Sequence, residues 1–89
     1  MRLVHVEWED ACSLDEWTPI EDLDVEPKRC STIGHLVREV ANAITVASTI
    51  SPEGEACCCI VIPRGMILKI SDVTVGEETN RQVGLHDNE

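Results

Sequence analysis

The sequence contains three consecutive cysteines, Cys57-Cys58-Cys59, whose thiols could bind a metal ion. Thiolates bind zinc, so Cys57 or Cys59 could form a zinc site with Cys12, Cys30 and His35. However, neighbouring residues of a strand point to opposite faces, and three adjacent cysteines cannot all reach one ion. Cysteine also packs as a small hydrophobic side chain, and an odd total of five argues against a complete disulfide framework. We therefore expect reduced, metal-free cysteines that serve packing, and we expect no cofactor.

Cationic and aromatic residues are the other candidates, and they would suit a small anionic ligand. Arg64 follows a proline in a predicted turn, where its guanidinium could clamp a phosphate or a carboxylate or simply face solvent. Tryptophan can stack on a base, and a histidine between apolar neighbours is more typical of a half-buried structural residue. The candidate ligand-binding residues are Arg64, His35, Trp8, Trp17, Arg38 and Lys69, with Arg29 as a further cation.

The sequence contains no nucleophile–base signature, no phosphate-binding loop and no paired metal motif. These are the patterns by which hydrolases, nucleotide-dependent enzymes and metalloenzymes are recognised. We therefore expect a protein that is not an enzyme.

The pattern of apolar residues predicts five short strands that position these candidates. In the first strand Val4, Val6 and Trp8 share one face. Gly34, in the middle of the second strand, predicts a bend or a close approach of another backbone. Pro63-Arg64-Gly65 predicts a tight turn between the last two strands, because proline cannot donate to a sheet ladder. The predicted strands are residues 2–8, 29–39, 44–50, 56–62 and 66–72.

A long acidic connection, residues 9–27, separates the first two predicted strands. Two sequences within it have the spacing of a capping box, so we expect one short helical turn. Trp17, Ile20 and Leu23 follow one another at a spacing of three, which could pin the connection onto the sheet. This connection is either an interaction surface or a packed surface loop.

Charge is distributed unevenly along the 89 residues, whose formal net charge is −10. Residues 1–27 carry −8, residues 28–72 carry +1 and residues 73–89 carry −3. An acidic chain repels phosphate backbones, which argues against nucleic-acid binding through a basic surface. We expect one domain at residues 1–75 and a flexible polar tail at residues 76–89. The sequence shows no signal peptide and no membrane span, so a cytoplasmic location is expected.

The absence of Phe and Tyr predicts a thin core, and a small protein with a thin core is often stabilised by association. Both faces of the strands in residues 28–72 carry apolar residues, but a small barrel has only one interior. We expect a homo-oligomer whose contact is this nearly neutral strand surface, with the acidic segment facing outward.

Five short strands, a bent second strand and a tight last turn predict an all-β fold, a small and strongly bent barrel with a short helical turn in the first connection. The sequence IVIPRGMILKI, residues 60–70, resembles the strand, one-turn helix and strand that close Sm-like and SH3-like barrels. CSTIGHLVRE, residues 30–39, resembles the bent second strand of the same fold. The RNA-binding motifs of the Sm family are not matched, so RNA binding is not implied.

The chain as a whole, with WEDA at residues 8–11 and DEWT at residues 15–18, also resembles small uncharacterised bacteriophage proteins. This resemblance covers residues 1–73 and implies an accessory or counter-defence role in the cytoplasm of a host cell. One hypothesis is a homo-oligomer that sequesters a small nucleotide-like signal at its subunit interfaces. The alternative is an acidic module that blocks a host defence or DNA-binding protein, in the manner of a DNA mimic. A structural accessory protein of the virion is a third interpretation.

Overall fold

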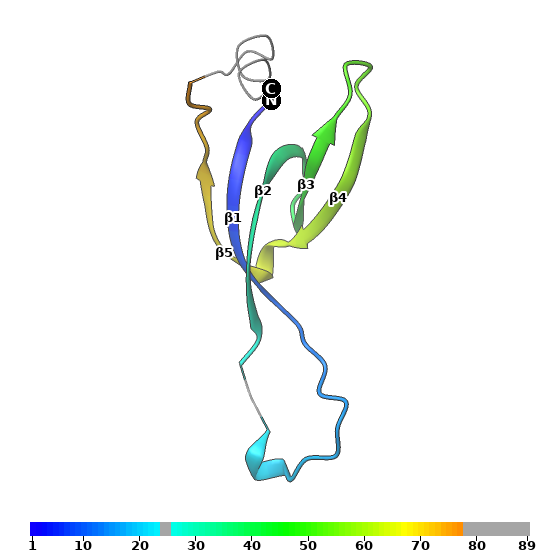
Figure 1. The fold of residues 1–89 in the computed structure, drawn as a ribbon, viewed down its shortest axis with the longest axis vertical. Coiled ribbons are helices and arrows are strands. Elements are labelled where there is room, and N and C mark those ends of the chain that lie inside the picture. Colours follow the sequence, from blue (N-terminus) through cyan, green and yellow to red (C-terminus); the bar gives the residue numbers. More distant parts are fainter. Residues whose placement is uncertain (24–25, 78–89) are drawn as a thin grey trace, which may run out of the picture.

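A computed structural model describes residues 1–23 and 26–77, and in this part five antiparallel strands form one sheet. The strand order is β4-β3-β2-β1-β5, as Figure 1 shows. The all-β prediction is confirmed, and the predicted strand bounds differ from the observed ones by at most two residues. The elements are β1 (Leu3–Asp10), η1 (Ile20–Asp22), β2 (Lys28–Glu39), β3 (Ala43–Ile50), β4 (Ala56–Pro63), η2 (Arg64–Met66) and β5 (Ile67–Asp72), where η denotes a single 3-10 turn.

The bend of β2 folds the sheet over on itself. This strand pairs with β1 over eight residues, and its second half also pairs with β3. At Gly34 the two strands approach so closely that a Cβ atom would lie 2.6 Å from the carbonyl oxygen of Ala47 and 2.7 Å from Cγ1 of Val46. A register shift follows, which leaves Val37 without an opposite residue in β3. The close approach predicted for Gly34 is therefore confirmed.

The folded sheet encloses a small aliphatic core. Val4, Val6 and Trp8 of β1 share the inner face, as their alternation predicts. The Trp8 indole Nε1 donates a hydrogen bond to Thr32 Oγ1 at 3.0 Å, so its polar atom has a partner. The cluster of buried residues is Val4, Val6, Trp8, Ile44, Val46 and Ile62, with Cys30, Leu36, Ile60, Ile67 and Ile70 packed against it.

The described sheet does not close into the predicted barrel, because β4 and β5 are its two edges. The two strands are joined by η2, but each pairs on one side only, β4 with β3 and β5 with β1. Pro63 lacks an N–H group at the end of β4, and β5 has only six residues. The sheet therefore keeps two open edges.

The acidic connection does not pack on the sheet, which corrects the prediction that Trp17, Ile20 and Leu23 pin it there. All three side chains are exposed. The cause is the length of the β1–β2 ribbon, whose pairing continues to Asp10 opposite Lys28. Figure 1 shows that this ribbon carries the connection beyond the core, where no sheet face lies beneath it.

The predicted helical turn is present as η1, but it begins after Pro19 and has no side-chain cap. The Thr18 hydroxyl instead donates to the carbonyl of Glu16 at 3.2 Å. Residues 78–89, most of the predicted tail, lie outside the described residues. No helix in residues 1–23 and 26–77 is long and apolar enough to span a membrane.

Gly34→Ala should lower the free energy of unfolding by about 1–3 kcal/mol, because the new methyl group would overlap the backbone of β3. Gly65→Ala is the matched control, since no atom beyond its two chain neighbours lies within 4 Å of its Cβ position. It should change stability by less than about 1 kcal/mol. Urea denaturation of both variants measures the difference, and equal stabilities would contradict the role assigned to Gly34.

Candidate functional site

The six predicted ligand-binding residues are not gathered into one site. Trp8 belongs to the core, whereas Trp17 lies on the acidic connection. His35 is half-buried in β2, opposite Leu3 on one side and Ala47 on the other. The other three lie on separate elements, Arg38 near the end of β2, Arg64 in η2 and Lys69 in β5.

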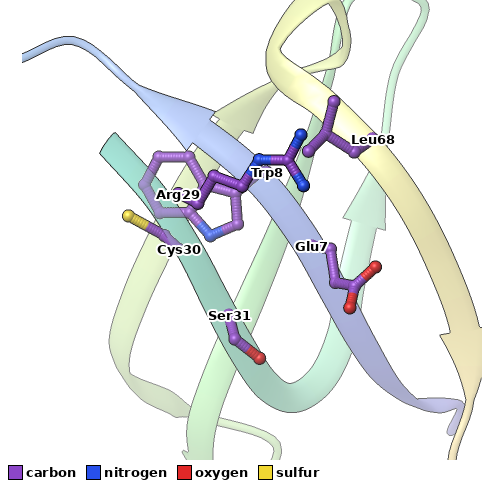
Figure 2. A pocket seen from close by; sticks show the side chains of 6 residues that line it. All are labelled: Glu7, Trp8, Arg29, Cys30, Ser31 and Leu68. Carbon is purple, nitrogen blue, oxygen red and sulfur yellow. The ribbon is translucent and has the colours of Figure 1, made fainter. Parts of the chain in front are cut away.

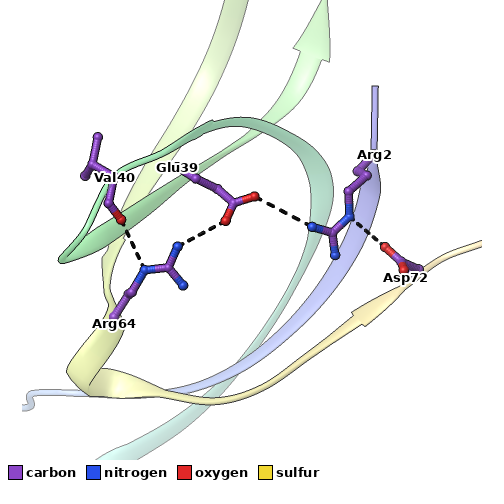
Figure 3. A network of polar contacts seen from close by, with 5 residues as sticks. All are labelled: Arg2, Glu39, Val40, Arg64 and Asp72. Carbon is purple, nitrogen blue, oxygen red and sulfur yellow. Dashed lines mark hydrogen bonds and ion pairs between the residues drawn. The ribbon is translucent and has the colours of Figure 1, made fainter.

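Arg64 makes contacts within its own chain. Its Nε donates to the carbonyl of Val40 at 3.1 Å, and its Nη2 lies 3.1 Å from a carboxylate oxygen of Glu39. Its backbone N–H donates to the carbonyl of Asn42 at 2.8 Å. Arg64 thus fastens η2 to the turn between β2 and β3, and its guanidinium already holds a carboxylate (Figure 3).

Arg2 extends this contact into a network of two cations and two anions. Its Nη1 lies 3.6 Å from the other oxygen of Glu39, and its Nε lies 2.8 Å from Asp72. The network connects the first residues of the chain with the ends of β2 and β5, as drawn in Figure 3. Its charges balance, and all four side chains are substantially exposed, so the ion pairs contribute little stability individually.

A cavity of about 200 Å³ lies beside Trp8. Leu68 reaches it because the β1–β5 register shifts between Glu7 and Trp8, which leaves Leu68 unpaired. Small-molecule pockets usually measure about 300–1,000 Å³, so this cavity is small for a nucleotide. Of the six predicted residues it contains only Trp8. Its lining residues, shown in Figure 2, are Glu7, Trp8, Arg29, Cys30, Ser31 and Leu68.

A second and more open cavity of about 290 Å³ lies beside the end of β2. It contains Arg38 together with Arg2 and Glu39 of the ion-pair network. Beyond these charged residues neither cavity has a signal in the sequence, because a β-bulge such as the one at Leu68 leaves no mark in the hydrophobic pattern.

The cysteines differ most from prediction. Cys12, Cys57, Cys58 and Cys59 are exposed, and only Cys30 contacts the core, so packing does not account for the thiol run. The Cys57 and Cys58 sulfur atoms lie 3.4 Å apart, whereas strand geometry predicted opposite faces. The reason is the backbone of Cys58, whose φ of 57° lies in the left-handed region. That conformation costs about 1–2 kcal/mol for a non-glycine residue.

All five cysteines are free thiols. The hydrogen bond with Cys58, and negative charge on that neighbour, raise the pKa of the Cys57 thiol above its ordinary value. In the described residues, no three His, Cys, Asp or Glu side chains are placed to hold a metal ion. The combination of Cys12, Cys30, His35 and a residue of the thiol run is therefore not assembled.

The acidic arm, which we define as residues 11–27, presents large apolar side chains to solvent. Trp17 is fully exposed, and Ile20 keeps 85% of its surface. Leu14 and Leu23 are also exposed. Six acids and no base occur in this arm. The arrangement is an extended acidic segment with apolar anchors, of which the sequence pattern places Trp17, Ile20 and Leu23 on the sheet instead.

Exposed apolar side chains also occur on the sheet. Ile33 of β2 and Val61 of β4 each keep more than 60% of their surface, and Leu68 of β5 keeps 47%. His5 of β1 is hydrogen-bonded to the Ser31 hydroxyl of β2, and Lys69 of β5 stands opposite Glu7 in the β1–β5 register. The outer face thus mixes apolar side chains with polar and charged ones.

Arg64→Ala should lower the free energy of unfolding by about 1 kcal/mol, because a charged hydrogen bond and an ion pair are lost. A double-mutant cycle with Glu39→Ala should give a coupling of about 0.2–1 kcal/mol that decreases with salt. Arg38→Ala is the control, since the described residues give it no ion-pair partner, and it should stay within about 0.5 kcal/mol of wild type. An unchanged stability for Arg64→Ala together with a coupling of zero would contradict the contacts assigned to Arg64.

Comparison of the chain with protein-family models, with curated proteins and with solved structures finds no significant match. The geometry of the arm, the cavities and the thiol pair is therefore the basis for the functional proposals that follow.

Proposed function

We propose that this chain is a non-enzymatic binding module whose acidic arm docks on a basic surface of another protein. The exposure of Trp17 carries the proposal. Tryptophan is among the residues most enriched at the energetic centres of protein interfaces, where its ring fills a pocket of the partner. Leaving such a side chain in water on an arm held away from the core has no benefit for folding.

The charges of the arm specify the partner's chemistry. Asp15 and Glu16 precede Trp17, and Glu21 and Asp22 follow Ile20. Carboxylates around apolar anchors attract a basic surface over long range and repel acidic surfaces, while the anchors supply the short-range contact. The resemblance to small bacteriophage proteins would make the partner a host protein, and covering its basic surface would block its binding of DNA or of another protein.

Photo-crosslinking from the arm tests this proposal. The photoreactive residue p-benzoylphenylalanine is placed at position 17, and irradiation is carried out in the cells that express the chain. We expect a crosslink to a protein with a basic surface, and the purified complex should weaken with salt and with Trp17→Ala by about tenfold or more.

The same photoreactive residue at position 75 is the matched control, because Val75 is also exposed but lies outside the arm. A partner crosslinked equally from both positions would contradict docking through the arm. A crosslink from position 17 only to another copy of the chain would identify the arm as a self-association element and would also overturn the proposal.

A second candidate function is the sequestration of a small nucleotide-like ligand between copies of the chain. The cavity beside Trp8 favours it, because Arg29 and an aromatic ring could bind a phosphate and a base. The cavity is too small to enclose a nucleotide within one protomer, so a second copy would have to complete it. His35, Arg38, Arg64, Lys69 and Trp17 would contribute only across such an interface.

This second candidate requires self-association through the outer face of the sheet. Ile33→Glu should therefore convert an oligomer into a monomer of about 9.8 kDa in light scattering, because the carboxylate would be buried in the interface. Ile20→Glu on the arm is the control and should leave the mass unchanged. A wild-type chain that stays monomeric at low and at high salt would remove this candidate and leave the arm as the functional element.

We also propose that the open sheet is a variant of the SH3-like and Sm-like architecture. Three features support the relation: the bent β2, the strand order in which β1 stands between β2 and β5, and the one-turn η2 between β4 and β5. The open edges between β4 and β5 are the difference from a closed barrel.

A further inference from the structure

The thiols of Cys57 and Cys58 are held side by side by the backbone of β4. Their sulfur atoms lie 3.4 Å apart. Cys58 has a φ of 57°, the left-handed region that residues other than glycine rarely adopt, and this conformation turns the two neighbouring side chains toward each other. The Ser48 hydroxyl donates to the carbonyl of Cys58 at 3.2 Å, which supports the turned peptide from β3. An unusual backbone conformation of this kind is a reason to look for function.

Both thiols are accessible from solvent. Cys57 and Cys58 are exposed, and β4 is an edge strand of the described sheet, so no other strand covers its outer side. Neither sulfur atom belongs to the buried core. A small reagent can therefore reach the pair without unfolding the protein.

The pair is better suited to hold a third atom than to form a disulfide. Adjacent Cα atoms are about 3.8 Å apart across a trans peptide, whereas the Cα atoms of disulfide-bonded cysteines are usually about 4.4–6.8 Å apart. A direct bond between Cys57 and Cys58 would thus be strained, but a bridging atom lets the sulfur atoms remain near their present separation.

The bridging atom must also be one that needs only two ligands from the protein. Structural zinc takes four ligands, and the described residues place no group of three potential ligands together. A soft centre that binds two thiols and carries its own third substituent fits the pair. Trivalent arsenic in an organic arsenoxide has this chemistry.

We propose that Cys57 and Cys58 form a two-thiol site that binds one soft, thiol-seeking centre of the trivalent arsenic class. In the reaction with an arsenoxide, two S–H bonds and the arsenic–oxygen bonds break, two As–S bonds form, and the oxygen leaves as water with both thiol protons. Arsenic remains trivalent, so no oxidant or reductant is required. Each thiol attacks arsenic as its thiolate, and the proton that it gives up is taken by the departing oxygen.

Native mass spectrometry of the full chain with phenylarsine oxide tests the site. The wild-type protein should take up one phenylarsenic group, with the loss of two hydrogens, and should release it to a dithiol but not to a monothiol. Cys57→Ser and Cys58→Ser should each weaken binding about 100-fold or more, because the second As–S bond then loses its high effective concentration. Cys59→Ser, the adjacent exposed thiol, is the matched control and should bind like wild type.

Retention of tight binding in both Cys57→Ser and Cys58→Ser would overturn the proposal, and so would its loss in Cys59→Ser. Circular dichroism of each variant checks that the exposed substitution leaves the sheet intact. A third outcome would also overturn the proposal. The wild-type chain would lose two hydrogens under mild oxidation, and neither the oxidised nor the reduced chain would bind the arsenical. Cys57 and Cys58 would then be a disulfide-forming pair.

Discussion

The close approach of β2 and β3 at Gly34 determines how the sheet bends and what it buries. Only a residue without a side chain lets the backbone of Ala47 and the side chain of Val46 lie so near β2. This contact bends the five-stranded sheet, so that β1 and β3 bury Val4, Val6, Ile44 and Val46 against one another. Because the chain has no Phe or Tyr to fill space, a close approach is needed for the aliphatic side chains to meet.

The same bend determines what remains outside the core. The sheet folds over without joining its edges, so β4 keeps a free side on which Cys57 and Cys58 are accessible. The β1–β2 ribbon continues straight past the core to the pair of Asp10 and Lys28 and holds the acidic arm in solvent. The open edge and the exposed arm both follow from how the strands pair, and they are the features on which we base the proposed binding role.

The sequence predicted the parts that depend on local pattern. Alternation placed Val4, Val6 and Trp8 on the inner face, and glycine and proline marked the bend at Gly34 and the turn at Pro63. Barrel closure could not be predicted, because side-chain alternation specifies faces and leaves the pairing of edges open. No sequence pattern predicts a left-handed backbone conformation at a residue other than glycine, so that of Cys58 could not be predicted. The contact of Arg64 with Glu39 could not be predicted either, because the two residues are distant in sequence. Trp17 looked like a packing residue because spacing alone does not reveal whether a surface lies beneath it.

In the free protein the apolar anchors of the arm stand in solvent, and acrylamide quenching of tryptophan fluorescence measures this exposure for Trp17. The chain has two tryptophans, Trp8 in the core and Trp17 on the arm. We predict two emission components for the wild-type monomer: a red, readily quenched one that disappears in Trp17→Phe, and a blue, protected one that remains. A Trp17 component that is blue and protected while light scattering reports a monomer of about 9.8 kDa would place the arm on the sheet and contradict the account.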